Sequence, residues 1–108
     1  MLSGYRLMWM MAVFDLPVMS VEQRRRATRF RNDLLDLGFV MMQFSVYLRH
    51  TASKEQANAL ADAVSSRVPA AGKVDVLLFT DKQYESIRTF RGDASANRPR
   101  RPDQLELF

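Results

Sequence analysis

The stretch LMWMMAVFD, residues 7–15, is apolar at every position before its closing aspartate. An alternating strand leaves one face in water, whereas a continuous apolar run of this length is typical of a central strand covered on both faces. The run is too short to span a bilayer, and no small-residue cleavage site follows it, so we expect neither a membrane segment nor a signal peptide. We expect a central strand that ends at Asp15.

Two amphipathic helices are predicted after this strand, and each begins with the same capping pattern. Ser20–Gln23 and Ser53–Gln56 both have the S-x-x-Q spacing in which the serine and glutamine side chains bond to free amides at a helix start. Apolar residues recur at helical spacing after each cap. The first helix is expected over residues 21–37, with Gly38 ending it in a left-handed turn, and the second stops before Pro69.

Three further strands are predicted. Residues 39–49 alternate apolar and polar side chains with no glycine or proline between them, which indicates one half-buried strand. Residues 74–79 predict a core strand, and residues 85–90 a short last strand. The element order predicts an α+β ferredoxin-like sandwich, with two helices on one face of a mostly antiparallel sheet and an extra C-terminal strand. This fold serves enzymes, regulatory modules and RNA-binding domains alike, so it does not identify a function.

Length and composition fit one small domain. The chain has 108 residues, of which 47% are hydrophobic and 26% charged, enough to build one core and too apolar for a disordered chain. We expect a domain over residues 1–90 and a flexible basic tail over residues 91–108. No cysteine is present and His50 is the only histidine, which argues against disulfides and a zinc site and permits a cytoplasmic protein.

The charge balance favours a nucleic-acid partner. The net charge is +4 at pH 7, and most of the basic residues are arginines, which suit bidentate contacts with phosphate. Five of them lie in the first predicted helix: Arg24, Arg25, Arg26, Arg29 and Arg31. A solvated face explains Arg25 and Arg29, but it does not explain five arginines with few acidic partners. We therefore expect contacts with the phosphate backbone that do not read sequence.

The order and spacing of three motifs resemble the CRISPR-associated protein 2 family. The chain has the run MAVFD at residues 11–15, then an arginine-rich helix, then QFSVY at residues 43–47. The resemblance covers residues 6–90. It departs from the family at Phe14, where many members have tyrosine, so a phenol cannot be essential there. The family fold also breaks the stretch 39–49 into two short strands, although no turn residue indicates a break here.

The resemblance implies a function in CRISPR adaptation, the acquisition of new spacers. It implies a homodimer in which the last strand of each chain joins the partner's sheet, and a partnership with the CRISPR integrase. The dimer is expected to bind a DNA duplex or RNA and to bridge integrase subunits as an adaptor. A stand-alone, toxin-like endoribonuclease is the alternative. A small-ligand regulatory module is not favoured, because no glycine-rich loop is present.

Asp15 is the candidate catalytic residue. From its position alone, a carboxylate between a strand and Pro17 is more often a turn-forming or helix-entry residue. The resemblance reverses this preference, because the family's equivalent aspartate is the proposed magnesium ligand. Magnesium usually takes one or two carboxylates together with water and phosphate. Two Asp15 side chains facing each other across a dimer axis are therefore expected to hold Mg²⁺ in an endonuclease.

The tail ends in an apolar segment that predicts partner docking. The candidate docking residues are Gln104, Leu105, Leu107 and Phe108. In one interpretation the segment adds as a strand to an exposed sheet edge, within this chain or on the integrase. In the other, it resembles the short peptide by which bacterial polymerases and repair proteins bind the replication sliding clamp. Both interpretations fit an apolar end on a polar, proline-containing linker.

Overall fold

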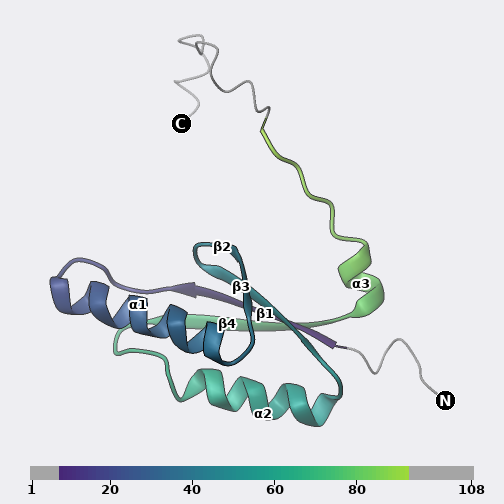
Figure 1. The fold of residues 1–108 in the computed structure, drawn as a ribbon, viewed down its shortest axis with the longest axis horizontal. Coiled ribbons are helices and arrows are strands. Elements are labelled where there is room, and N and C mark those ends of the chain that lie inside the picture. The colour runs from purple at the N-terminus through teal and green to yellow at the C-terminus, as the bar shows by residue number, and fades with distance from the viewer. Residues whose placement is uncertain (1–7, 93–108) are drawn as a thin grey trace.

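The computed structural model describes residues 8–92 of the chain. Its elements are, in order, β1 (Met8–Asp15), α1 (Val21–Asp36), β2 (Val40–Gln43), β3 (Val46–Thr51), α2 (Lys54–Ser65), β4 (Lys73–Thr80) and α3 (Asp81–Glu85). The strands form one antiparallel sheet in the order β2-β3-β1-β4, and α1 and α2 lie on the same side of it (Figure 1). The predicted α+β ferredoxin-like sandwich with a central first strand is confirmed.

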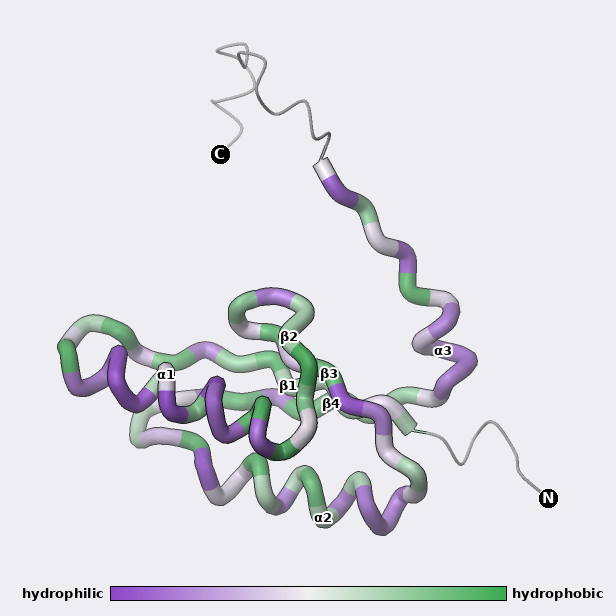
Figure 2. Tube along the Cα trace, viewed as in Figure 1, coloured by the Kyte–Doolittle hydropathy of each residue, from purple (hydrophilic) through white to green (hydrophobic). Residues whose placement is uncertain are grey.

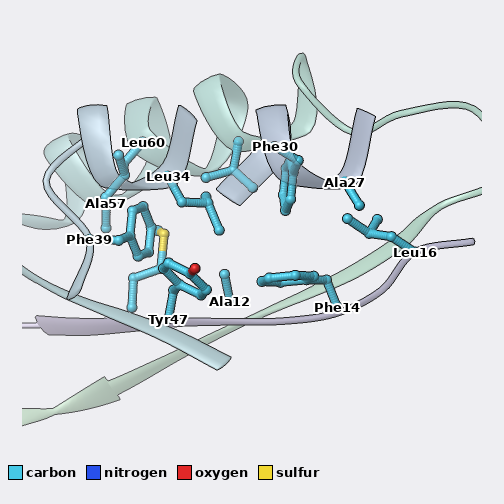
Figure 3. Packing of buried hydrophobic residues seen from close by; sticks show 12 residues of the cluster. Ala12, Phe14, Leu16, Ala27, Phe30, Leu34, Phe39, Tyr47, Ala57 and Leu60 are labelled. Carbon is cyan, nitrogen blue, oxygen red and sulfur yellow. The ribbon is translucent and has the colours of Figure 1, made fainter. Parts of the chain in front are cut away.

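The core lies between this sheet and the two long helices. Alternate residues of β1 point toward the helices, and Met10, Ala12 and Phe14 are all buried there. Both helices bury the apolar stripe that their sequence predicts. The ring of Phe14 meets the ring of Phe30 from α1 edge to face, with 5.1 Å between centroids (Figure 3). This packing holds β1, and therefore its last residue Asp15, on a rigid base.

Helices α1 and α2 each begin with a serine cap. At α1, the backbone N–H of Gln23 donates to Ser20 Oγ, and the Gln23 side-chain oxygen accepts from the N–H of Ser20, both at 3.0 Å. The hydroxyl of Ser53 caps α2 in the same way, at 3.1 Å from the N–H of Gln56. These bonds satisfy amides that a helix start leaves free, so the predicted helix starts are confirmed.

The end of α1 is also as predicted. Gly38 has a φ of 91°, the left-handed conformation that glycine adopts without strain. A Cβ at this position would come within 3.3 Å of Arg49 Nε, so the site favours glycine for space as well. The Arg49 guanidinium donates to the carbonyl of Leu37 at 2.8 Å, which satisfies one of the last carbonyls of the helix.

The prediction of a single strand over residues 39–49 is wrong. The chain reverses at Phe44 and Ser45, so that β2 and β3 form a hairpin in which Gln43 pairs with Val46. Neither turn residue has a positive φ, which explains why no glycine or asparagine marks the turn. The reversal also changes which side chains are buried: Tyr47 packs in the core (Figure 3), whereas Phe44 is 65% exposed.

The predicted strand over residues 85–90 is wrong as well, and with it the extra C-terminal strand in this chain. Residues 81–85 form α3, and residues 87–92 have no regular secondary structure. A capping box like that of α1 starts this helix, because Thr80 Oγ1 accepts from the N–H of Gln83 at 3.1 Å and the Gln83 side chain accepts from the N–H of Thr80. The T-x-x-Q spacing was readable in the sequence beside the two serine caps.

The second face of the sheet is largely uncovered within residues 8–92. Trp9, Met11 and Val13 of β1 point to it, and the register places Leu77 and Phe79 of β4 beside them. We call this surface the open face. Among the described elements α3 packs on it, at the Trp9 end, where the Tyr84 ring stacks on the indole at 4.0 Å and Trp9 Nε1 donates to Asp81 Oδ1 at 2.8 Å. Hydrophilic residues concentrate instead along α1 (Figure 2).

Candidate functional site

Asp15 is the last residue of β1 and is exposed at the end of the sheet opposite α3. The residue before it is held firmly, because Phe14 is buried and its N–H donates to the carbonyl of Ser45 at 3.1 Å. Asp15 stands opposite Lys73 on β4 and alternates with Phe14, so it projects to the same side as Val13, the open face. Its side chain makes no ion pair or hydrogen bond within residues 8–92. Its carboxylate is available to a ligand.

The fold brings a second carboxylate to this end of the sheet that the sequence reasoning missed. Asp75 pairs with Val13 and is therefore a diagonal neighbour of Asp15 on the same face. Such neighbours have Cα atoms about 7–8 Å apart. Lys73 is the residue opposite Asp15 and lies two residues before Asp75 on β4, and its Nζ is 3.5 Å from Asp75 Oδ2 in an exposed pair. Sixty residues of sequence separate the two aspartates, so only the β1–β4 register reveals the pair.

The structure separates the five predicted arginines of α1 by their contacts. Arg24 donates to the backbone carbonyl of Val18 at 3.0 Å. Glu22 forms exposed ion pairs with the next two arginines: its Oε2 lies 3.0 Å from Arg25 Nη1, and its Oε1 lies 3.3 Å from Arg26 Nε.

The last two arginines differ from each other. Arg31 lies over the ring of Phe44, with 3.7 Å from its guanidinium carbon to the ring centroid, and Nε donates to the Phe44 carbonyl at 3.4 Å. It therefore fastens the β2–β3 turn to α1. The side chain of Arg29 makes no ion pair or hydrogen bond with any residue from 8 to 92.

The oxygen ligands at the Asp15 end match a hard cation. Asp15 and Asp75 offer carboxylate oxygens, the donors that Mg²⁺ prefers, and the ion usually keeps several waters beside one or two carboxylates. No group of three acidic or histidine ligands forms in the described part of the chain. One chain therefore fits an ion held partly by water, by substrate phosphate or by a second chain.

Some predicted features lie elsewhere. The docking residues Gln104, Leu105, Leu107 and Phe108 are outside the described residues. Among residues 8–92, none of the helices is both long enough and apolar enough to cross a membrane.

These features define a small α+β domain with an exposed carboxylate at the end of its central strand and an arginine-rich first helix. A family model, CRISPR associated protein Cas2, matches residues 8–87. A protein of Paracidovorax avenae named CRISPR-associated endoribonuclease Cas2 is 52% identical over 108 residues, which are the whole of both chains. A protein of the same name from Flavobacterium psychrophilum is 39% identical, over 99% of this chain and 93% of its own. The chain belongs to the CRISPR-associated protein Cas2 family.

A solved structure agrees with this fold. A crystal structure described as cas2 superimposes with a TM-score of 0.57 over 82% of this chain and 92% of its own, at 24% identity. At that identity the likeness supports the fold alone.

Proposed function

We propose that the chain acts in CRISPR adaptation as a homodimer that binds nucleic acid and bridges integrase subunits. The observation that carries the proposal is that the molecule has an apolar surface on one side and a basic surface on the other. An apolar sheet face is largely uncovered within residues 8–92, and an arginine-rich helix lies on the opposite side. An adaptor of this kind needs shape and charge but no chemistry of its own. Membership of the family supplies the CRISPR context.

The open face supports the homodimer. β4 pairs only with β1, so its outer edge has free backbone groups within the described chain. Residues 87–92 have no strand partner there, and Ile87 and Phe90 are exposed, with Phe90 at 79%. In a two-fold dimer, each of these segments adds to the β4 edge of the partner while the apolar faces pack together. The strand missing from one chain would then form between two.

The arginines of α1 support nucleic-acid binding on the other side of the molecule. Five guanidinium groups on one helix attract a phosphate backbone, and contacts of this kind are independent of sequence. A protein that must accept arbitrary spacer DNA requires such binding. RNA presents the same backbone charge.

A magnesium-dependent endonuclease is the second candidate, and a specific observation favours it. Asp15 is exposed on a rigid strand end with Asp75 beside it, and the relatives are named endoribonucleases. When bound, magnesium supplies Lewis-acid polarisation of a phosphodiester and orients a water. The residues of the chain have simpler tasks: Asp15 and Asp75 supply ligand oxygens, and the exposed Lys73 amine attracts a phosphate oxygen. A two-fold dimer presents each group twice, which makes the dimer the catalytic unit.

One substitution separates the two candidates. Asp15→Ala is expected to leave a folded dimer, to abolish magnesium-dependent cleavage of labelled RNA or DNA, and to leave spacer acquisition in cells intact. Asp62→Ala is the matched control, because it removes an exposed carboxylate from α2. Cleavage by Asp15→Ala at the wild-type rate would refute the catalytic assignment. Loss of acquisition with an intact dimer would refute the adaptor.

A further inference from the structure

Four of the five arginines of α1 lie on two flanks of the helix. Arg24 and Arg31 are seven residues apart and therefore share one flank, where both bond to backbone carbonyls. Arg26 and Arg29 lie on the other flank, toward the loop that joins α2 to β4. Within residues 8–92, the side chains of Arg26 and Arg29 bond to no backbone carbonyl, and Arg25, which lines no part of this side, is paired with Glu22.

A groove runs between that flank and the loop. One hollow, of about 320 Å³, is lined by Arg26, Arg29, Phe30, Asp33, Arg67, Pro69 and Ala70. A smaller hollow of about 160 Å³ continues from it and shares Arg26, Pro69 and Ala70. Together they follow α1 from Gln23 to Asp33, which is about 15 Å at 1.5 Å per residue. We call this feature the arginine groove, and it is long enough for more than one phosphate of a strand.

Arg67 enters the groove from a different element. It follows α2, and one of its terminal nitrogens donates to the carbonyl of Ala63 at 2.7 Å and to Ser66 Oγ at 3.2 Å. These bonds fix the side chain at the end of the helix. Its remaining N–H groups make no hydrogen bond within residues 8–92. The groove therefore holds a second source of guanidinium donors opposite α1.

The charge inside the groove selects an anion. The larger hollow is lined by three guanidinium groups and one carboxylate, Asp33, which leaves two positive charges in excess. Arg26 is also paired with Glu22 at 3.3 Å, but that pair is half-exposed, and exposed ion pairs contribute little. The pair can open at small cost, whereas guanidinium groups bond to phosphate strongly and often with two parallel bonds.

We propose that the arginine groove binds consecutive phosphates of a nucleic-acid strand, and that Arg29 and Arg67 are its principal contacts. The proposal rests on the nucleic-acid binding proposed above and assigns it to one flank of α1. The proposal thus assigns phosphate binding to Arg67, which lies 36 positions beyond Arg31, the last arginine of α1. Arg24 and Arg31 are structural residues in this proposal, because they line neither hollow and instead bond to the carbonyls of Val18 and Phe44.

The test compares single charge losses in the full chain. Binding of one labelled DNA duplex and of an RNA duplex of the same sequence is titrated across a salt series for the wild type, Arg29→Ala and Arg67→Ala. Each variant is expected to weaken binding about tenfold, the loss of one charge-assisted hydrogen bond. The slope of log affinity against log salt is expected to flatten by about 0.9 per lost contact on the DNA duplex. Comparing the two duplexes shows which nucleic acid the groove prefers.

Lys54→Ala is the matched control, because it removes one positive charge at the opposite end of α2 and outside the groove. It should keep the wild-type slope. Arg29 has no intramolecular bond within residues 8–92, so Arg29→Ala tests the groove even if Arg67→Ala loosens the end of α2. Wild-type binding with unchanged slopes for both groove variants, or equal losses for Lys54→Ala, would overturn the groove alone. No binding by the wild type would overturn the proposed nucleic-acid function with it.

Discussion

The two faces of β1 carry the same kind of residue in different surroundings. Met10 and Phe14 face the helices and are buried, whereas Met11 and Val13 face the open side and are only partly covered. A continuously apolar strand is expected to be covered on both faces, but within residues 8–92 helices α1 and α2 cover one. The comparison teaches that one face holds the fold together and that the other is suited to a partner. Substitutions on the covered face should therefore change the free energy of unfolding, whereas substitutions on the uncovered part of the open face should change assembly.

The largest effect on stability is expected on the covered face. Phe30→Ala removes a ring that is 1% exposed and that packs edge to face on Phe14. The cavity and the lost burial should lower the free energy of unfolding by about 3–5 kcal/mol, measured by urea denaturation followed by circular dichroism. A loss below about 1 kcal/mol would show that the helix layer contributes less than its packing indicates.

A smaller effect is expected where α3 packs on the open face. Trp9→Phe removes the 2.8 Å hydrogen bond to Asp81 and replaces the indole that stacks on Tyr84 by a smaller phenyl ring. The expected loss is about 1 kcal/mol in the same denaturation experiment. Tyr84→Phe is the control, since it keeps the stacked ring and should stay within about 0.5 kcal/mol of the wild type. A larger loss for Tyr84→Phe would mean that its hydroxyl, rather than the indole bond, fastens α3.

The smallest effect on the single chain, and the largest on assembly, is expected at Leu77. This side chain lies opposite Met11 on the open face and is 46% exposed. Leu77→Glu should change the free energy of unfolding by no more than about 0.5 kcal/mol. In the proposed dimer, however, it would bury an unpaired charge, so the dimer should dissociate in analytical ultracentrifugation.

Leu35→Glu provides the comparison for this change. Leu35 is similarly exposed, at 48%, but lies on α1 away from the open face. This variant should sediment as the wild type does. If both variants remained dimeric, the dimer would use another surface, and if both dissociated, added negative charge rather than position would be the cause.

Much of the fold was predictable because its signals are local. The apolar run of β1, the serine caps of α1 and α2 and Gly38 each report on a few neighbouring residues. The hairpin between β2 and β3 was not predictable from turn chemistry, because Phe44 and Ser45 keep negative φ and a distant residue, Arg31, fastens the turn. Helix α3 was predictable in principle from Thr80 and Gln83.

The candidate site was predictable only in part. The position of Asp15 at a strand end follows from the sequence, and so does the clustering of arginines in α1. Asp75 and Arg67 could not be found in this way, because the first depends on the β1–β4 register and the second on the approach of the α2–β4 loop to α1. Conversely, the sequence cannot show that Arg31 is already engaged with Phe44.

The three helix caps have a consequence for how the molecule responds to acid. In each cap a serine or threonine hydroxyl accepts from the N–H of a glutamine, namely Gln23, Gln56 or Gln83, at a position where the capping-box pattern also allows a glutamate. An amide gains no proton in mild acid, whereas a glutamate at this position would be neutralised as the pH falls through about 4. The hydrogen bonds of these caps therefore contain no group that gains a proton in mild acid. Near the N-terminus of α1, the glutamine also spares the adjoining arginines another carboxylate that would compete with phosphate.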